Sequence, residues 1–76
     1  MKVLIESILP FLVEHPDQIN IVELVGEKTL IYELRCSNGD IGKLIGKNGK
    51  TISAIRTLLS IAANREGKRA LLEVVQ

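Results

Sequence analysis

The chain has 76 residues, of which 46% are hydrophobic and 25% are charged, and its formal net charge is +1. This composition predicts one small folded domain over residues 1–76, with no room for a separate catalytic domain. Cys36 and His15 are the only residues of their types, which excludes an internal disulfide and argues against a zinc or iron site. We therefore expect no metal and no other cofactor.

The beginning of the chain is predicted to form an amphipathic helix. Its apolar residues follow the helical spacing i, i+3, i+4 and i+7: Ile5, Ile8, Leu9 and Leu12. Pro10 removes a backbone hydrogen bond, so we expect a kink or a late start, and residues 15–17 should end the helix. Glu6 interrupts the apolar stretch and no cleavage site follows, so the segment does not resemble a signal peptide. No run is long enough to span a bilayer, and we expect a cytoplasmic protein.

A β-hairpin is predicted next, from residues 19–25 and 29–36, with the turn at residues 26–28. In the second strand, apolar residues alternate with others and share one side: Leu30, Tyr32, Leu34 and Cys36. At the end of this apolar side, Cys36 is expected to be a buried structural thiol rather than a reactive one.

Two helices and a last strand should complete an α+β fold of order α-β-β-α-α-β. Residues 37–40 form a turn with helix-capping chemistry at its end, and a short helix over residues 41–45 should stop at Gly46. A longer helix follows Gly49, and its apolar positions keep helical spacing: Ile52, Ile55, Leu59 and Ala62. Residues 69–75 are predicted to form the last strand. We expect a three-stranded sheet with the helices on one face and a core that includes Leu34, Ile52, Ile55 and Leu59.

The charges are unevenly distributed along the chain. Residues 39–69 carry seven lysines and arginines against two acidic residues, a net charge of +5, whereas residues 1–38 have a net charge of −3. Cations clustered around a glycine-rich turn favour an anionic ligand on one face. The alternative is a solvated surface with a chance asymmetry.

The glycine-rich turn, Gly46-Lys47-Asn48-Gly49, does not match a nucleotide-binding loop. A phosphate loop ending in Gly49-Lys50-Thr51 needs a glycine five residues before Gly49, where the chain has Leu44. The dinucleotide pattern also needs a glycine at that position, and a helix rather than a buried strand leads into the turn. No Ser/His/Asp set or carboxylate pair suggests a catalytic site either.

The remaining pattern is two helices joined by a Gly-x-x-Gly turn, an arrangement suited to a polynucleotide backbone. Glycines let the turn approach a phosphodiester closely, and the second helix directs its unpaired N–H groups to the same place. Lys47 and Lys50 add positive charge, while Asn48 tolerates a left-handed conformation. The alternative is an ordinary connection between two helices, in which the glycines serve only geometry.

The segment from Leu44 to Arg56, LIGKNGKTISAIR, resembles the signature of the KH domain. In that signature an aliphatic residue, Ile and Gly precede two free residues, a second Gly and an Ile three positions later. The order of elements resembles the type II KH fold, because the turn lies late in the chain with α and β elements before it. The resemblance covers essentially the whole chain, and a stand-alone KH domain of this size resembles the bacterial KhpA family.

The resemblance implies a single-stranded RNA-binding module, since KH domains hold about four nucleotides between this turn and a hydrophobic groove. The implied RNA-binding residues are the turn, its neighbouring cations and part of the preceding helix: Gly46, Lys47, Asn48, Gly49, Lys50, Lys43, Gly42 and Ile41. Ile45 fits either the groove or the core, and Arg56 is a weaker candidate for a phosphate contact.

The family resemblance also implies partners. It suggests a homodimer, or a heterodimer with a second KH-containing protein of the KhpB (Jag) family, and a role as an RNA chaperone or post-transcriptional regulator. Pairing would hide exposed aliphatic residues such as Ile31 or Val75 against another subunit. The family also suggests pairing near the Gly-x-x-Gly helices, which would couple dimerisation to RNA access. The rival hypothesis is an assembly module with a KH fold and little RNA binding of its own. We do not expect an enzyme.

Overall fold

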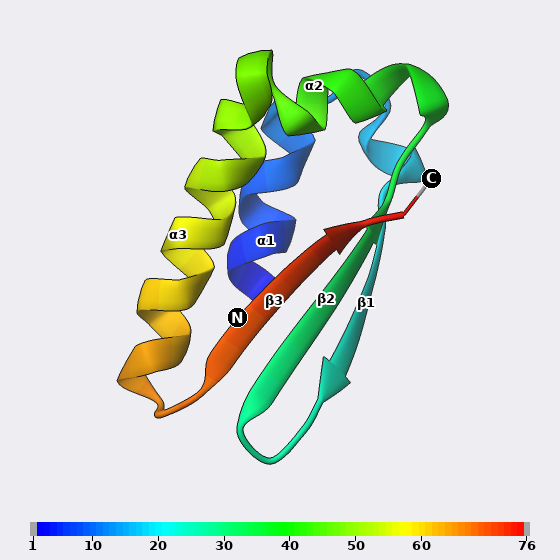
Figure 1. Cartoon of the computed structure of the whole chain (residues 1–76). Coiled ribbons are helices and arrows are strands. Elements are labelled where there is room, and N and C mark those ends of the chain that lie inside the picture. Colours follow the sequence, from blue (N-terminus) through cyan, green and yellow to red (C-terminus); the bar gives the residue numbers. More distant parts are fainter. Residues whose placement is uncertain (1, 76) are drawn as a thin grey trace.

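The computed structural model of the chain describes residues 2–75 and has the element order α-β-β-α-α-β, as predicted (Figure 1). Short 3-10 turns connect several of the elements. The main elements are α1 (Lys2–Ile8), β1 (Asn20–Val25), β2 (Thr29–Arg35), α2 (Ile41–Ile45), α3 (Lys50–Arg65) and β3 (Arg69–Val74).

The three strands form one mixed sheet with the order β1-β2-β3. β1 and β2 are antiparallel, with Ile21 opposite Leu34, as the hairpin pattern predicts. β3 pairs in parallel with β2 and places Val74 beside Leu34. A parallel pair needs a crossover connection, and here α2 and α3 provide it.

The core lies between the sheet and the helices α1 and α3, which cover one face (Figure 1). The predicted core residues are confirmed, because Leu34, Ile52, Ile55 and Leu59 are all buried. Tyr32 is fully buried as well, and its hydroxyl donates a hydrogen bond of 2.7 Å to Glu23. In α3 the last fully buried residue is Ala63 rather than Ala62, because the next turn of the stripe after Leu59 falls four residues later.

The first helix is shorter than the sequence pattern suggests. The α-helix ends at Ile8, and Leu9–Phe11 form a separate 3-10 turn with Pro10 in its first positions. Proline has no N–H to donate to the preceding turn, so the regular hydrogen-bond ladder cannot continue through it. The predicted continuation to residues 15–17 is therefore wrong, although Leu9 still reaches the core.

Cys36 is half-buried and packs against the core rather than lying within it. Burial, followed by the nearby charge of Asp40, raises the pKa of its thiol. A raised pKa keeps the nucleophilic thiolate scarce, which agrees with a structural role. In the part of the chain described here, every helix is too short or too polar to cross a membrane.

Candidate nucleic-acid interface

The turn at residues 46–49 has a backbone that few residue types can adopt. Gly46 has φ 80° and ψ 171°, and Gly49 has φ 71° and ψ 15°. Asn48 lies between them at φ 56° and is the only described non-glycine residue in residues 2–75 with positive φ. Asparagine tolerates this left-handed region better than most residues. The turn thus changes the direction of the chain sharply between α2 and α3 within four residues (Figure 1).

The two glycines are needed for different reasons. A Cβ on Gly46 would lie 2.1 Å from Thr51 Oγ1 and 2.9 Å from the Thr51 backbone nitrogen. A Cβ on Gly49 would meet nothing within 4 Å, so only its positive φ favours glycine there. Gly46 therefore fixes the close approach of the turn to α3, whereas Gly49 provides conformational freedom.

The outer side of the turn is open to solvent and positively charged. The side chains of Lys47, Asn48 and Lys50 are all exposed. No side chain caps the N-terminus of α3, although within the turn the Gly49 N–H donates to the Gly46 carbonyl and the Lys50 N–H to the Lys47 carbonyl. A helix of this length carries partial positive charge at that end. The turn therefore offers cationic side chains and the positive end of a helix to an anion at one place.

The short helix α2 is held against the core by the apolar residues on its buried side. Leu44 is buried in the core, and Ile45 is half-buried against it, so the core interpretation of Ile45 is the one that its packing supports. Ile41 is also half-buried, while Gly42 is exposed and a Cβ there would meet no atom within 4 Å. Of the expected groove residues on α2, Gly42 is thus the accessible one.

Asp40 anchors the beginning of α2 in a way that the sequence does not predict. Its carboxylate makes no capping bond to α2. Instead it accepts hydrogen bonds from the backbone N–H groups of Glu14, at 3.1 Å, and His15, at 2.9 Å. The expected helix-capping chemistry is therefore wrong, because the side chain turns inward to satisfy the chain that follows α1.

Burial alone would raise the pKa of the Asp40 carboxyl, which is 1% exposed. The backbone hydrogen bonds from Glu14 and His15, together with the nearby Ser37 side chain and the charge of His15, stabilise the charged form and outweigh burial, so the pKa lies below its ordinary value of 3.8. The carboxylate thus stays ionised and holds the beginning of α2 against the segment after α1.

Lys43 is placed less favourably for phosphate binding than Lys47 and Lys50. Its ammonium group forms an ion pair with the Glu14 carboxylate and lies 3.9 Å from Asp40 Oδ1. Both partners compete with any anionic ligand for this charge. The loop cations Lys47 and Lys50 have no such ion pair among the described residues.

A groove of about 440 Å³ runs between α3 and the outer edge of β3. Its lining combines polar and apolar residues. Its lining residues are Arg56, Ser60, Arg69, Ala70, Leu71, Leu72 and Glu73. Arg56 crosses the groove and donates hydrogen bonds of 3.3 Å from Nε and 3.2 Å from Nη2 to the Leu72 carbonyl. Arg56 therefore lies on the groove wall and is not directed at the turn.

Ser60 and Arg69 were not identified as site residues from the sequence. One signal was present, because Ser53, Arg56 and Ser60 form a polar stripe at helical spacing on α3. Arg56 lies about 9 Å from Lys50 along the axis of α3, at a rise of 1.5 Å per residue. The turn and the groove therefore lie at successive positions along the same helix, α3.

Comparison with known proteins agrees with this architecture. The family model described as "KhpA/KhpB, KH domain" matches residues 2–74. The chain belongs to this KhpA/KhpB KH-domain family. The type II KH fold expected from the order of elements is confirmed by the α+β structure with its three-stranded sheet.

Relatives in the family match along their whole length. A protein of Chlamydia muridarum named RNA-binding protein KhpA is 45% identical over 76 residues, covering 100% of this chain and 97% of the relative. RNA-binding protein KhpA of Clostridium acetobutylicum is 43% identical over 75 residues, covering 99% of this chain and 100% of the relative. The protein of the same name from Aquifex aeolicus is 37% identical over 76 residues, covering 100% of this chain and 96% of the relative. No solved structure matches the chain.

Proposed function

We propose that this chain binds single-stranded RNA, with the turn at residues 46–49 holding the sugar-phosphate backbone. The observation that carries the proposal is the exposed, cationic Gly-x-x-Gly turn at the N-terminus of α3, the helix that also forms one wall of the groove. Names that describe KhpA relatives as RNA-binding proteins support it.

The turn suits a phosphodiester because it combines close approach with donors. Gly46 brings the turn onto Thr51, and Gly49 has no side chain to keep a ligand away. Lys47 and Lys50 supply charge from exposed positions. Backbone N–H groups and lysines act on phosphates of any sequence, so this part of the site gives affinity rather than base selectivity.

The α3–β3 groove suits the bases. Its alanine and leucine side chains can cover base faces, while Arg56, Ser60 and the β3 backbone offer hydrogen-bonding groups for base edges. Aromatic side chains are absent from its lining, which argues against a stacking platform.

The same proposal makes the protein a binding module and not an enzyme. KhpA relatives are named for RNA binding, which is not a catalytic class. A role as an RNA chaperone or post-transcriptional regulator in the cytoplasm follows from binding short unstructured segments with modest affinity.

We also propose that the chain pairs with itself or with a second KH-domain protein of the KhpB type. Ile31 and Val75, expected to be exposed, are half-buried. In the C-terminal half of α3, Leu58 is 47% exposed and Ile61 is 54% exposed, and these form a better apolar surface for pairing. Sedimentation that shows a monomer at high micromolar concentration, alone and with a KhpB-type protein, would contradict pairing.

Binding of a fluorescent octauridylate at several salt concentrations tests the RNA proposal. A phosphate-binding site loses affinity as salt rises, with a slope of about −0.7 for each phosphate contacted on a single strand. An assembly module that only shares the KH fold would bind no RNA at any salt concentration.

A further inference from the structure

The two edges of the sheet differ in whether a side chain bonds to their free backbone groups. At the β3 edge, Arg56 donates two hydrogen bonds to the Leu72 carbonyl and occupies one of the free backbone groups. At the β1 edge, no side chain within residues 2–75 bonds to the backbone of the strand. The unpaired edge of β1 is therefore the open one.

The hairpin identifies which backbone groups face this open edge. The Gly26 N–H donates to the Thr29 carbonyl at 2.8 Å, so these two residues form a hydrogen-bonded pair. Such pairs alternate along an antiparallel ladder, and Leu24 and Val22 therefore direct their N–H and C=O groups toward β2. By the same alternation, Ile21, Glu23 and Val25 direct theirs outward, where only water or another strand can satisfy them.

β1 also lacks most of the features by which edge strands usually avoid pairing. Its sequence, NIVELV, contains no proline and no lysine, it pairs with β2 without a bulge, and its one charged residue, Glu23, is bonded to the Tyr32 hydroxyl. Leu24 is 49% exposed and Val25 is 64% exposed, so the strand is apolar as well as open. An edge of this kind is a template for an added strand.

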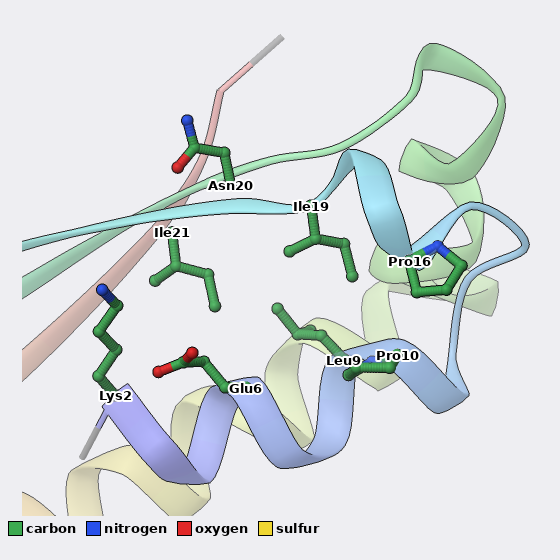
Figure 2. Close-up of a pocket in the computed structure, with 8 residues that line it drawn as sticks. All are labelled: Lys2, Glu6, Leu9, Pro10, Pro16, Ile19, Asn20 and Ile21. Carbon is green, nitrogen blue, oxygen red and sulfur yellow. The ribbon is translucent and has the colours of Figure 1, made fainter.

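A crevice of about 320 Å³ lies between β1 and α1, beside this edge. Figure 2 shows Ile19 and Ile21 pointing from the strand side toward Leu9 on the helix side, with Lys2 and Glu6 at one end. The crevice is lined by Lys2, Glu6, Leu9, Pro10, Pro16, Ile19, Asn20 and Ile21. A strand added to β1 would direct every second side chain to the helix side, over this crevice.

The charges near the edge define the chemistry of the occupant. Glu6 lines the crevice and Glu23 lies on the helix side of β1, against the one lysine of the lining, Lys2, so these three side chains carry a net charge of −1. This acidic excess beside the edge favours a basic partner.

We propose that the free edge of β1 docks an extended segment of a protein partner by strand addition. The segment carries an aliphatic side chain that enters the crevice, flanked two residues away on each side by lysine or arginine. Main-chain hydrogen bonds to Ile21, Glu23 and Val25 would provide affinity, and the crevice with its acidic rim would provide selectivity. This surface is separate from the groove between α3 and β3, so both ligands can bind together.

The probe is a blocked heptapeptide, Gly-Lys-Thr-Ile-Thr-Lys-Gly, added to the full-length protein at millimolar concentration. Amide hydrogen exchange by NMR should show new protection at Ile21, Glu23 and Val25, whereas Val22 and Leu24, already bonded to β2, change little. The same peptide with N-methyl groups on alternate amides should give no protection. Absence of protection at the three outward amides, or protection confined to other elements, overturns the proposal.

Charge selectivity is tested with Glu6→Lys and with Glu27→Lys as the matched control. Both residues are exposed, but only Glu6 lines the crevice. Glu6→Lys should weaken binding of the basic peptide by about fivefold to tenfold and improve binding of its counterpart with glutamate in place of lysine. Glu27→Lys should change neither by more than about twofold. Equal effects of the two variants would overturn the proposed occupant, and octauridylate binding serves as the measure that the rest of the protein is intact.

Discussion

Gly46 lies so close to Thr51 that a Cβ on the glycine would be 2.6 Å from the threonine Cβ. Gly46 also has φ 80° and ψ 171°, a region that only glycine adopts readily. Gly46→Ala should therefore combine backbone strain with a steric clash against the first turn of α3. We expect a loss of about 3 kcal/mol or more in the free energy of unfolding, measured by urea denaturation.

Gly49→Ala is the matched control for that variant. The added Cβ would meet no atom within 4 Å, so only the left-handed conformation opposes it, at a cost of about 1 kcal/mol. If the two variants lose equal stability, the contact between Gly46 and Thr51 does not determine the geometry of the turn.

Replacing Lys47 and Asn48 together with Asp tests the turn as the phosphate-binding element. Both side chains are exposed, Asp tolerates the left-handed conformation of residue 48, and acidic residues near the N-terminus of α3 are favourable for the helix. The thermal midpoint should therefore change little. RNA affinity should fall at least about tenfold, because a charge of +1 becomes −2 beside the phosphates, and the salt dependence should flatten by about 0.7 in slope. Unchanged affinity for octauridylate at physiological salt, in a protein that melts like the parent, would show that the turn is not the phosphate clamp.

Ser60→Glu tests the groove between α3 and β3. The residue is exposed and lines the groove beside Arg56, so a glutamate there places negative charge where RNA is proposed to lie. We expect octauridylate to bind about fivefold more weakly, with a change in stability within about 0.5 kcal/mol. Asn64→Glu makes the same change in net charge at an exposed position of α3 outside the groove lining and far from the turn, and it should leave affinity within about twofold. A similar loss in both variants would point to a long-range effect of net charge rather than to the groove.

Much of the fold can be read from local patterns in the sequence. The alternation around Leu34 predicts the hairpin because one side of β2 must face the core. The spacing of Ile52, Ile55 and Leu59 predicts α3 and its buried side for the same reason. The need for glycine at position 46 follows from the sharp change of direction between two helices.

The rest depends on contacts between distant residues, which periodicity does not encode. Asp40 has the residue type and position of a helix cap, but its partners are backbone groups 26 and 25 residues earlier. The groove exists because β3 returns parallel to β2 and brings the Leu72 carbonyl to Arg56. Neither pairing can be deduced before the strand order is known. The roles of the individual RNA-binding residues stay predictions until the variants above are measured.

The buried carboxylate of Asp40 predicts a specific dependence of stability on pH. Its pKa is lowered in the folded protein, so the unfolded chain binds this proton more tightly than the native state. The stability that the carboxylate contributes is therefore fully present above its ordinary pKa of 3.8 and is lost as pH falls through the lower folded value.

Asp40→Asn keeps the shape of the side chain but removes the charge and one of the two acceptor oxygens that face Glu14 and His15. We expect the variant to melt at a lower temperature than the parent at neutral pH, with the difference narrowing as pH falls below 3.8. Thermal melts followed by circular dichroism from pH 7 to pH 2 measure this difference in melting temperature. Asp17→Asn, at an exposed acid, is the control. A difference between Asp40→Asn and the parent that is constant over the whole range would mean that the lost charge is not what destabilises the variant.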